Sequence, residues 1–330
     1  MTADPRSPHH ATAALAEADR LMTVCNSCRY CEGLCAVFPA MEMRRAFSDG
    51  DLDYLANLCH NCGACYVDCQ FSPPHPFNVN VPRVLAEVRA ESYGRHVWPG
   101  AFAPVFDRNG LWIALIAAAS VALFIAGFVG LGESSTLFAV HQGPGAFYRL
   151  MPHNTMAVLF GGAFGFAVTA IGIGLARFWR DTGAGRGQKA GDVAQAAHDA
   201  ATLRYLDGGG VGCYTADERP DDRRRLYHHL TFYGFLLCFA ATTVGTGYHY
   251  LLGRLAPYPW WDLPPMLGTI GGLMLMVGTA GLFSARLRRE PMMSDVRRLG
   301  MDMAFTAMLF LTAATGLALH MLRTTPAMGL

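Results

Sequence analysis

The chain has 330 residues, of which 52% are hydrophobic and 15% are charged, against roughly 25% charged in an ordinary soluble domain. Its formal net charge of +1 gives no basic excess and argues against a nucleic-acid partner. Residues 1–100 are polar and rich in cysteine, whereas most of the remainder is long apolar runs. We therefore expect a soluble head (1–100) and a membrane domain (101–330). No cationic start with an apolar core opens the chain, so no signal peptide is predicted.

Residues 11–24 predict a short amphipathic helix that leads into the first cysteine. Residues 41–62 predict a second helix, with Ser48 or Asp51 as a possible cap. These signals favour an all-α chain whose head is the mostly helical type of two-cluster ferredoxin-like domain.

Eight of the ten cysteines form two runs of one spacing, C-x2-C-x2-C-x3-C. This spacing is a bacterial ligation pattern for [4Fe–4S] clusters. Three thiolates of a run are expected to lie on one tight loop around one cubane, and the fourth reaches the neighbouring cluster. One predicted set is Cys25, Cys28, Cys31 and Cys69. The other predicted set is Cys59, Cys62, Cys65 and Cys35.

Zinc and disulfides are the alternatives for these cysteines. An all-cysteine zinc site needs only paired C-x2-C units and leaves no role for the third and fourth cysteine of each run. A secreted disulfide scaffold has no reason to repeat one tight spacing twice. His60, beside Cys59, is expected to pack or hydrogen-bond nearby, and His75 to belong to a loop.

Five apolar stretches reach the length of about 20 residues that a helix needs to cross a bilayer. They are residues 111–131, 155–175, 231–252, 263–283 and 303–322, and none contains Asp, Glu, Lys or Arg. They predict a transmembrane helix bundle. Glycines within them favour close helix packing; these include Gly161, Gly162, Gly165, Gly271 and Gly272.

The connecting loops differ in basic residues. Residues 176–226 hold nine Lys or Arg and residues 284–302 hold five, whereas residues 132–154 and 253–262 hold one each. Basic loops stay on the cytoplasmic side. The chain is therefore expected in a bacterial inner membrane, multi-pass, with its cluster domain in the reducing cytoplasm.

Histidines are the functional signal in the membrane domain, because ionisable residues at membrane depth usually have a task. His228 and His229 open the third stretch and His249 closes it, so they mark opposite faces of the membrane. Opposed imidazoles could ligate a b-type haem. The candidates are His249, one of His228 and His229, and His153; interfacial hydrogen bonding is the alternative, and the one favoured for His320.

Other features carry weaker signals. The glycine-rich run Asp207–Cys213 matches no phosphate-binding pattern and predicts a flexible loop. Cys213 and Cys238 are expected to be ordinary thiols. The aromatic residues 258–261 predict an interfacial belt. No flavin or nicotinamide fingerprint is present, so two-electron chemistry is assigned to another protein.

Several long blocks carry a family resemblance: CNSCRYCEGLCAVFPAM, DYLANLCHNCGACYVDCQ with NVNVPR, RFWRD, LRYLDGG and HHLTFYGFLLCFAATTVGTGYHYLLG. They resemble tricarballylate-utilization protein B, also called citrate-utilization protein B, and the C-terminal half of CobZ-type proteins. The resemblance implies a partner FAD-dependent dehydrogenase that converts tricarballylate to cis-aconitate. It also implies two [4Fe–4S] clusters on the eight cysteines, a b-type haem, and delivery of electrons to quinone. Family members continue into a further span, whereas this sequence ends at Leu330.

The main hypothesis is thus an electron-transfer subunit that acts with a separate flavoprotein and has no catalytic residue of its own. A membrane redox sensor would need an output module, and none is visible. An accessory redox subunit of a CobZ-like cobalamin-biosynthesis system is a further alternative. A solute transporter would be supported by intramembrane carboxylates, which the five stretches lack.

Overall fold

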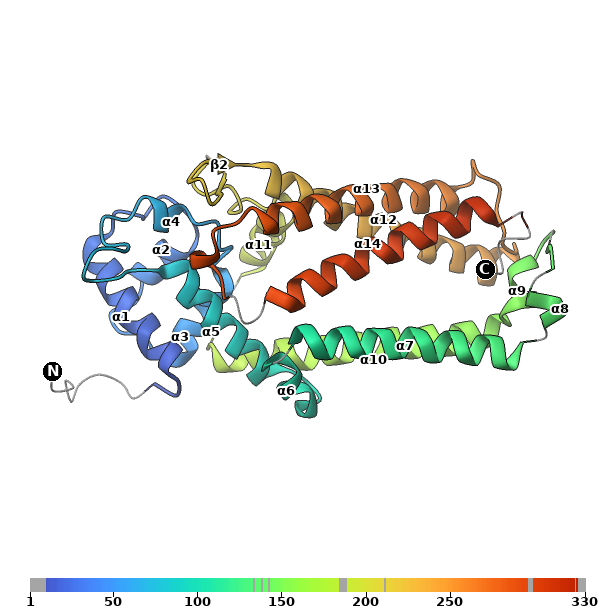
Figure 1. Cartoon of the computed structure of the whole chain (residues 1–330), viewed down its shortest axis with the longest axis horizontal. Coiled ribbons are helices and arrows are strands. Elements are labelled where there is room, and N and C mark those ends of the chain that lie inside the picture. Colours follow the sequence, from blue (N-terminus) through green and yellow to red (C-terminus); the bar gives the residue numbers. More distant parts are fainter. Residues whose placement is uncertain are drawn as a thin grey trace. The chain divides into compact units, whose positions relative to one another are not determined.

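The computed structural model describes residues 10–325, apart from residues 108, 133, 138, 142, 184–188, 211, 296–298 and 324. Helices supply nearly all of its regular structure (Figure 1), which confirms the expected helical class in outline. Within the described part, the exception is a short antiparallel pairing of β1 (Cys213–Tyr214) with β2 (Pro220–Asp221).

The chain divides into two compact units, here named the head unit and the bundle unit. The head unit comprises Met1–Asn109, Ala170–Arg225 and Ala285–Leu299. The bundle unit comprises Gly110–Thr169, Leu226–Ser284 and Gly300–Leu330.

Most elements belong to one unit. The head unit contains α1 (Ala13–Cys28), α2 (Val37–Glu42), α3 (Asp49–Leu58), α4 (Ala64–Val67), α5 (Val81–His96), η1 (Gly100–Phe102), α6 (Ala103–Asp107), α11 (Ala190–Thr202) and η2 (Pro291–Met293). The bundle unit contains nearly all of α7 (Asn109–Leu131) and α14 (Leu299–Leu322), with α8 (Ser134–Leu137) and α9 (Ala146–Leu150). Besides α7 and α14, which each leave one terminal residue in the head unit, three helices are divided between the units: α10 (His153–Asp181), α12 (Arg223–Leu252) and α13 (Leu263–Leu287).

In the head unit, α1, α3 and α5 pack around one apolar core (Figure 1). Its fully buried side chains include Leu15, Leu21, Met22, Leu52, Leu55 and Leu85. A capping box starts α3, because Ser48 Oγ accepts from the Asp51 N–H at 3.2 Å while the Asp51 carboxylate accepts from the Ser48 N–H at 3.1 Å. Both residues considered as caps therefore act together, and the predicted second helix is limited to Asp49–Leu58.

The first helix is longer than the sequence predicts. α1 continues through Cys25 and Cys28 and ends at Arg29, whose φ of 55° is left-handed. Residues three apart share one face of a helix, so α1 presents both thiols on the same side. The expectation that these two cysteines lie on a loop is wrong.

Within the described residues, five helices are long and apolar enough to cross a membrane. They are Gly110–Gly130, His153–Asp181, Arg223–Leu252, Leu263–Leu287 and Gly300–Leu322. Each overlaps one of the predicted apolar stretches. Large apolar side chains of α7 and α10, such as Leu123 and Val158, are exposed in the protein. Such a surface is typical of helices whose surroundings are lipid.

Glycines allow α12 and α13 to approach closely in the bundle unit. A Cβ on Gly271 would lie 2.7 Å from the carbonyl oxygen of Gly234 and 2.9 Å from the backbone nitrogen of Cys238. Such contacts are closer than side-chain carbons tolerate, so only glycine fits there. Gly272 likewise faces the side chain of Leu317 on α14.

The glycines of α10 do not have this role. A Cβ added to Gly161, Gly162 or Gly165 would meet no atom within 4 Å. The packing expected for these three glycines is therefore not found, and a small residue is not required at these positions by any contact of the described residues.

We predict that Gly271→Ala destabilises the bundle by about 1–3 kcal/mol, the usual cost of overpacking, because the added methyl must displace backbone atoms of α12. Gly162→Ala is the matched control, and it should be neutral or slightly stabilising because alanine favours helix. Thermal unfolding of both variants in detergent checks this. Equal losses in the two variants would contradict the close approach of α12 and α13.

Candidate functional site

The first set of thiols comes from three places in the head unit. Cys25 and Cys28 lie on the last turn of α1, Cys31 follows in the next turn, and Cys69 lies just beyond α4. All four border one small apolar cavity. The fourth cysteine of the second run thus lies with the first three of the first run.

The second set has the reciprocal composition. Cys59 caps the C-terminus of α3, Cys62 lies in the following loop, Cys65 lies in α4 and Cys35 precedes α2. These four border a second small cavity. Cys65 borders both cavities, so the two sets are neighbours.

The thiols crowd one another in water-poor surroundings. All are free cysteines. Burial, with the charges of neighbouring cysteines, raises the pKa of Cys25 and Cys31 to about 12. Burial also raises the pKa of Cys35 to about 12, with further contributions from the charges of Cys59 and Cys62. Four thiolates can share such a space only if positive charge accompanies them.

Each donor set consists of cysteine sulfur alone. Each cavity is bordered by the four cysteines of its set, with Cys69 in the first set and Cys35 in the second. Four cysteine thiolates are the ligands that a [4Fe–4S] cluster takes. Among the described residues, no group of three or more His, Cys, Asp or Glu side chains lies close enough to hold one metal ion.

Arginines clamp the loop of the second set. Asn61 is buried at a φ of 54°, and its N–H donates to Cys59 Sγ at 3.3 Å. Arg224 Nη1 donates to the Asn61 carbonyl oxygen at 3.2 Å, and Arg289 donates to both the carbonyl and side-chain oxygens of Asn61. Arg89 donates to the carbonyl oxygen of Cys59. The loop is therefore held from three sides.

Burial, with the positive charges of Arg224 and Arg286, lowers the pKa of Arg289 to about 9. That value still lies above neutral pH, so Arg289 is a cation in the neutral range.

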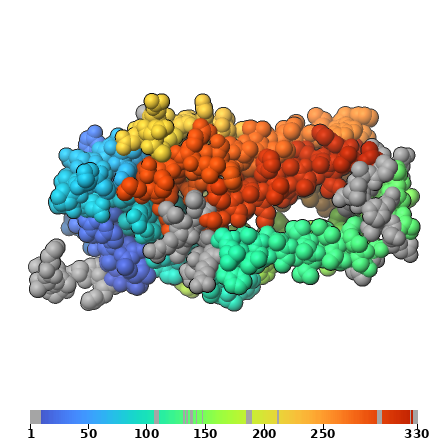
Figure 2. Space-filling model, viewed as in Figure 1, coloured from blue at the N-terminus to red at the C-terminus, as the bar shows by residue number. Residues whose placement is uncertain are grey.

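A ninth cysteine lies beside this loop. Cys213 is buried, and its Sγ accepts from Arg224 Nη1 at 3.5 Å. The adjacent Tyr214 N–H donates to the carbonyl oxygen of Cys62 at 2.8 Å. The β1–β2 hairpin also lies against the segment before η2, where the Ala216 N–H donates to the Arg288 carbonyl oxygen at 3.1 Å (Figure 2). Cys213 is a free cysteine, as expected of an ordinary thiol, and it contacts Arg224.

The glycine-rich run Asp207–Cys213 forms a turn in which some glycines pack closely against neighbouring residues. Gly209 and Gly212 have φ values of 84° and 103°, which favour glycine. A Cβ on Gly209 would lie 3.0 Å from the Leu34 side chain, and one on Gly212 would lie 2.6 Å from the backbone of β2. Its residue 211 lies outside the described residues.

Of the two histidines His60 and His75 in the head unit, His60 borders the cavity of the second set. Burial, with the charges of Arg224 and Arg89, lowers the pKa of His60. His75 belongs to a loop, where its ring packs edge-on against Phe77 and its Nδ1 accepts from the Phe77 N–H at 3.1 Å.

The bundle unit brings together His153 and His249. Their rings stack face to face, with centroids 3.9 Å apart and planes 8° from parallel. Tyr148 lies edge-on to both rings. A shared haem iron would need ring nitrogens that point at each other from opposite sides. Because they are stacked, the rings of His153 and His249 do not fit as two ligands of a shared haem.

His228 and His229 lie at the other end of α12 from His249. About 20 residues of helix separate them, which is roughly 30 Å at 1.5 Å per residue. His229 Nε2 is buried without a hydrogen-bond partner among the described residues. These two histidines and His249 therefore belong to different places in the protein.

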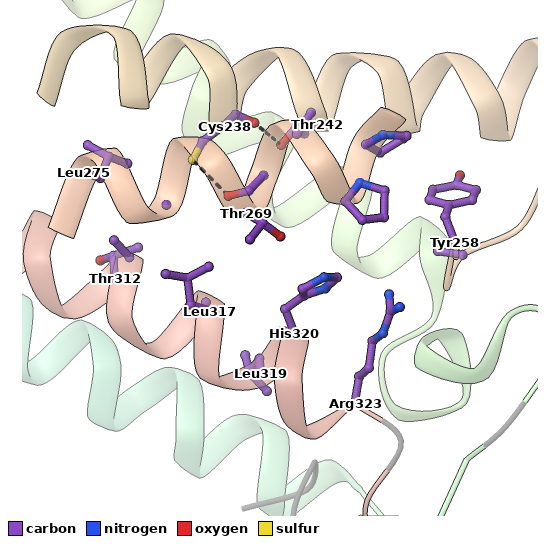
Figure 3. Close-up of a pocket in the computed structure, with 18 of the residues that line it drawn as sticks. Cys238, Thr242, Tyr258, Thr269, Leu275, Thr312, Leu317, Leu319, His320 and Arg323 are labelled. Carbon is purple, nitrogen blue, oxygen red and sulfur yellow. Dashed lines mark hydrogen bonds between the residues drawn. The ribbon is translucent and has the colours of Figure 1, made fainter. Parts of the chain in front are cut away.

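An apolar cavity of about 620 Å³ lies among α12, α13 and α14. Figure 3 shows His320, Arg323 and Tyr258 at one end of its lining and Leu275, Thr312 and Leu317 at the other. The sequence did not predict this cavity, because its lining residues come from separate helices and form no local motif.

At the polar end of this cavity, His320 and Arg323 both contact Trp260, a residue outside the cavity lining. The His320 ring packs edge-on against the Trp260 ring with centroids 4.1 Å apart, and the Arg323 guanidinium lies 5.0 Å from the centroid of the same ring. His320 Nε2 is buried and has no hydrogen-bond partner among the described residues. His320 thus lines a cavity, which the interpretation as an interface residue did not anticipate.

Comparison with known proteins covers nearly the whole chain. The model of the family described as Citrate utilization protein B matches residues 107–330, and that of the Citrate utilization protein B Fer4-like domain matches residues 18–95. The chain is 48% identical over 316 residues to "Citrate utilization protein B" of Escherichia coli, which covers 96% of this chain and 82% of that protein. No solved structure gives a significant match.

We predict that Cys35→Ser and Cys62→Ser remove the same cluster. Each should lower the bound iron by about half and abolish the same EPR signal, because both thiols border one cavity and each cubane takes four ligands. Cys238→Ser, in the bundle unit, is the control and should retain full iron. If Cys35→Ser instead abolished the signal that Cys28→Ser abolishes, the interleaved assignment would be wrong.

Proposed function

Because the chain belongs to the citrate utilization protein B family, we propose that it is a membrane-bound iron–sulfur electron-transfer protein. The observation that carries this proposal is the gathering of eight free thiols into two interleaved sets in one head. The Fer4-like match over residues 18–95 includes all eight. When bound, each cluster supplies a one-electron centre.

The proposed electron donor is a separate FAD-dependent dehydrogenase of the tricarballylate type. Oxidation of its substrate leaves two electrons on the flavin, and reoxidation of that flavin releases two electrons and two protons. Two neighbouring one-electron centres suit this task, because the flavin can then be emptied in single steps. The substrate chemistry belongs to the flavoprotein, and this chain positions the acceptors.

The proposed location is the bacterial inner membrane with the head in the cytoplasm. The two arginine-rich connections, residues 176–226 and 284–302, fall largely within the same compact unit as the cysteine sets. Basic segments stay on the cytoplasmic side, so the thiols would lie in the reducing compartment. The five apolar helices provide the anchor.

The proposed electron acceptor is a membrane quinone, which takes up two electrons and two protons to become a quinol. The cavity of about 620 Å³ in the bundle unit has the apolar lining that a quinone ring requires. At its polar end, His320 Nε2 and the Arg323 guanidinium are suited to donate hydrogen bonds to a quinone carbonyl oxygen. We propose this cavity as the quinone site.

We predict that the reduced flavoprotein reduces the clusters of this protein directly. Stopped-flow mixing under anaerobic conditions should show bleaching of cluster absorbance with simultaneous reoxidation of the flavin. The iron-free protein, prepared in parallel, is the control. Unchanged cluster absorbance after mixing would count against the proposed donor.

We predict that His320→Leu slows quinol formation at least tenfold, because the loss of a hydrogen bond to a group that gains negative charge costs about 1.5–3 kcal/mol. Cluster reduction by the flavoprotein should keep its wild-type rate. His198→Leu, an exposed histidine of α11, is the matched control. A His320→Leu protein with wild-type quinone reduction would remove this cavity from the proposal.

A further inference from the structure

The two cysteine sets differ in the charge around them. Three arginines surround the loop of the second set: Arg89 from α5, Arg224 from the first turn of α12 and Arg289 just beyond α13. Each guanidinium donates to a neutral oxygen of the loop rather than to a carboxylate. The positive charge at this loop is therefore not cancelled by those contacts.

Three other arginines of the head unit are paired with carboxylates. Arg20 lies 2.6 Å from Glu17, Arg44 lies 2.6 Å from Asp51, and Arg83 lies 3.1 Å from Glu87. Ion pairs of this kind leave little net field at a distance. The arginines at the second set differ from these three, because their contacts with the loop are to neutral oxygens.

The surroundings of the first set are more exposed and more acidic. Cys28 is exposed, whereas Cys59 is buried. The first loop has its own arginine contact, from Arg29 Nε to the Asn26 carbonyl oxygen at 3.1 Å, but Arg29 is exposed to solvent. Water and salt screen an exposed charge. The negative charge of Asp68 also acts on Cys31.

Charge near an iron–sulfur cluster sets its reduction potential, together with hydrogen bonds and solvent exposure. Reduction adds negative charge to the cluster, so nearby cations favour the reduced state. This effect is strongest where water is excluded, because the effective dielectric constant is low there. The arginine-clamped second set should therefore hold an electron more firmly than the first set, of which Cys28 is exposed.

We propose that Arg89, Arg224 and Arg289 give the cluster on Cys59, Cys62, Cys65 and Cys35 the higher reduction potential of the two. The cluster on the first set then accepts electrons from the flavoprotein and passes them to the cluster on the second set. This inference rests on the proposed function and adds the direction of transfer. Two of the three arginines flank α12 and α13, so the chain itself links this set to the apolar helices.

The test is an anaerobic EPR redox titration of the full chain in detergent. Cys28→Ser and Cys62→Ser identify the signals of the first and second set. The wild type should show two midpoint potentials, with the higher one on the second set. Arg224→Gln should change the equilibrium constant for electron transfer between the two clusters at least tenfold in favour of the first set. This corresponds to a decrease of about 59 mV in the midpoint potential of the second set, for a one-electron couple.

Arg224→Gln is suited to this measurement because Arg289 still satisfies the Asn61 carbonyl oxygen when Arg224 is lost. Arg224→Lys retains the charge and should retain most of the wild-type potential. Arg29→Gln is the matched control at the first loop and should leave both potentials unchanged. Iron content, measured on every variant, verifies that both clusters are present.

The proposal is overturned if the second set has the lower potential, or if Arg224→Gln and Arg29→Gln have equal effects. These results would leave the electron-transfer function standing. A wild-type protein without iron–sulfur EPR signals would instead overturn the proposed function together with this inference.

Discussion

Crowding of thiols in a small protein core is the constraint on which the head depends. Cys25, Cys31, Cys35, Cys59, Cys65 and Cys69 all contact or belong to the apolar cluster formed by α1, α3 and α5. Buried thiols resist ionisation, and neighbouring thiolates repel one another. A cluster that supplies iron cations resolves both conflicts. With its clusters bound as proposed, the head would couple cofactor loading to folding, as in other proteins whose metal ligands lie in the core.

The same constraint explains why distant segments gather at the second set. The loop carrying Asn61 exposes backbone oxygens in a place that excludes water, and unpaired buried oxygens are costly. Arg224 and Arg289 satisfy these oxygens and also bring positive charge to the thiols. Structural support and electrostatic tuning thus come from the same side chains. Cys213 and the packed glycine turn complete the enclosure.

The bundle unit follows different physics, because its apolar surface suits lipid rather than water as the surrounding solvent. Apolar side chains face outward on α7 and α10, and α12 and α13 pack through glycines. Polar groups in such surroundings need a reason to be there. His320 and Arg323 gather at one end of a cavity, whereas His153 and His249 stack on each other. These four polar groups of the bundle unit therefore gather at two separate places, the cavity end and the stacked histidine pair.

Features that depend on local spacing were predictable from the order of residues alone. The repeated cysteine spacing and the apolar stretches predicted the two runs, the helical class and the five long helices, because ligation motifs and helices are encoded by neighbouring residues. Which distant residues meet became known only from the folded arrangement of the chain. Arg224 contacts Asn61 across 163 positions in the chain, and Arg289 does so across 228. No periodic pattern in the sequence predicts such contacts, since they depend on the path of the whole chain. For the same reason, the surroundings of Cys213, His320 and the α10 glycines could not be predicted.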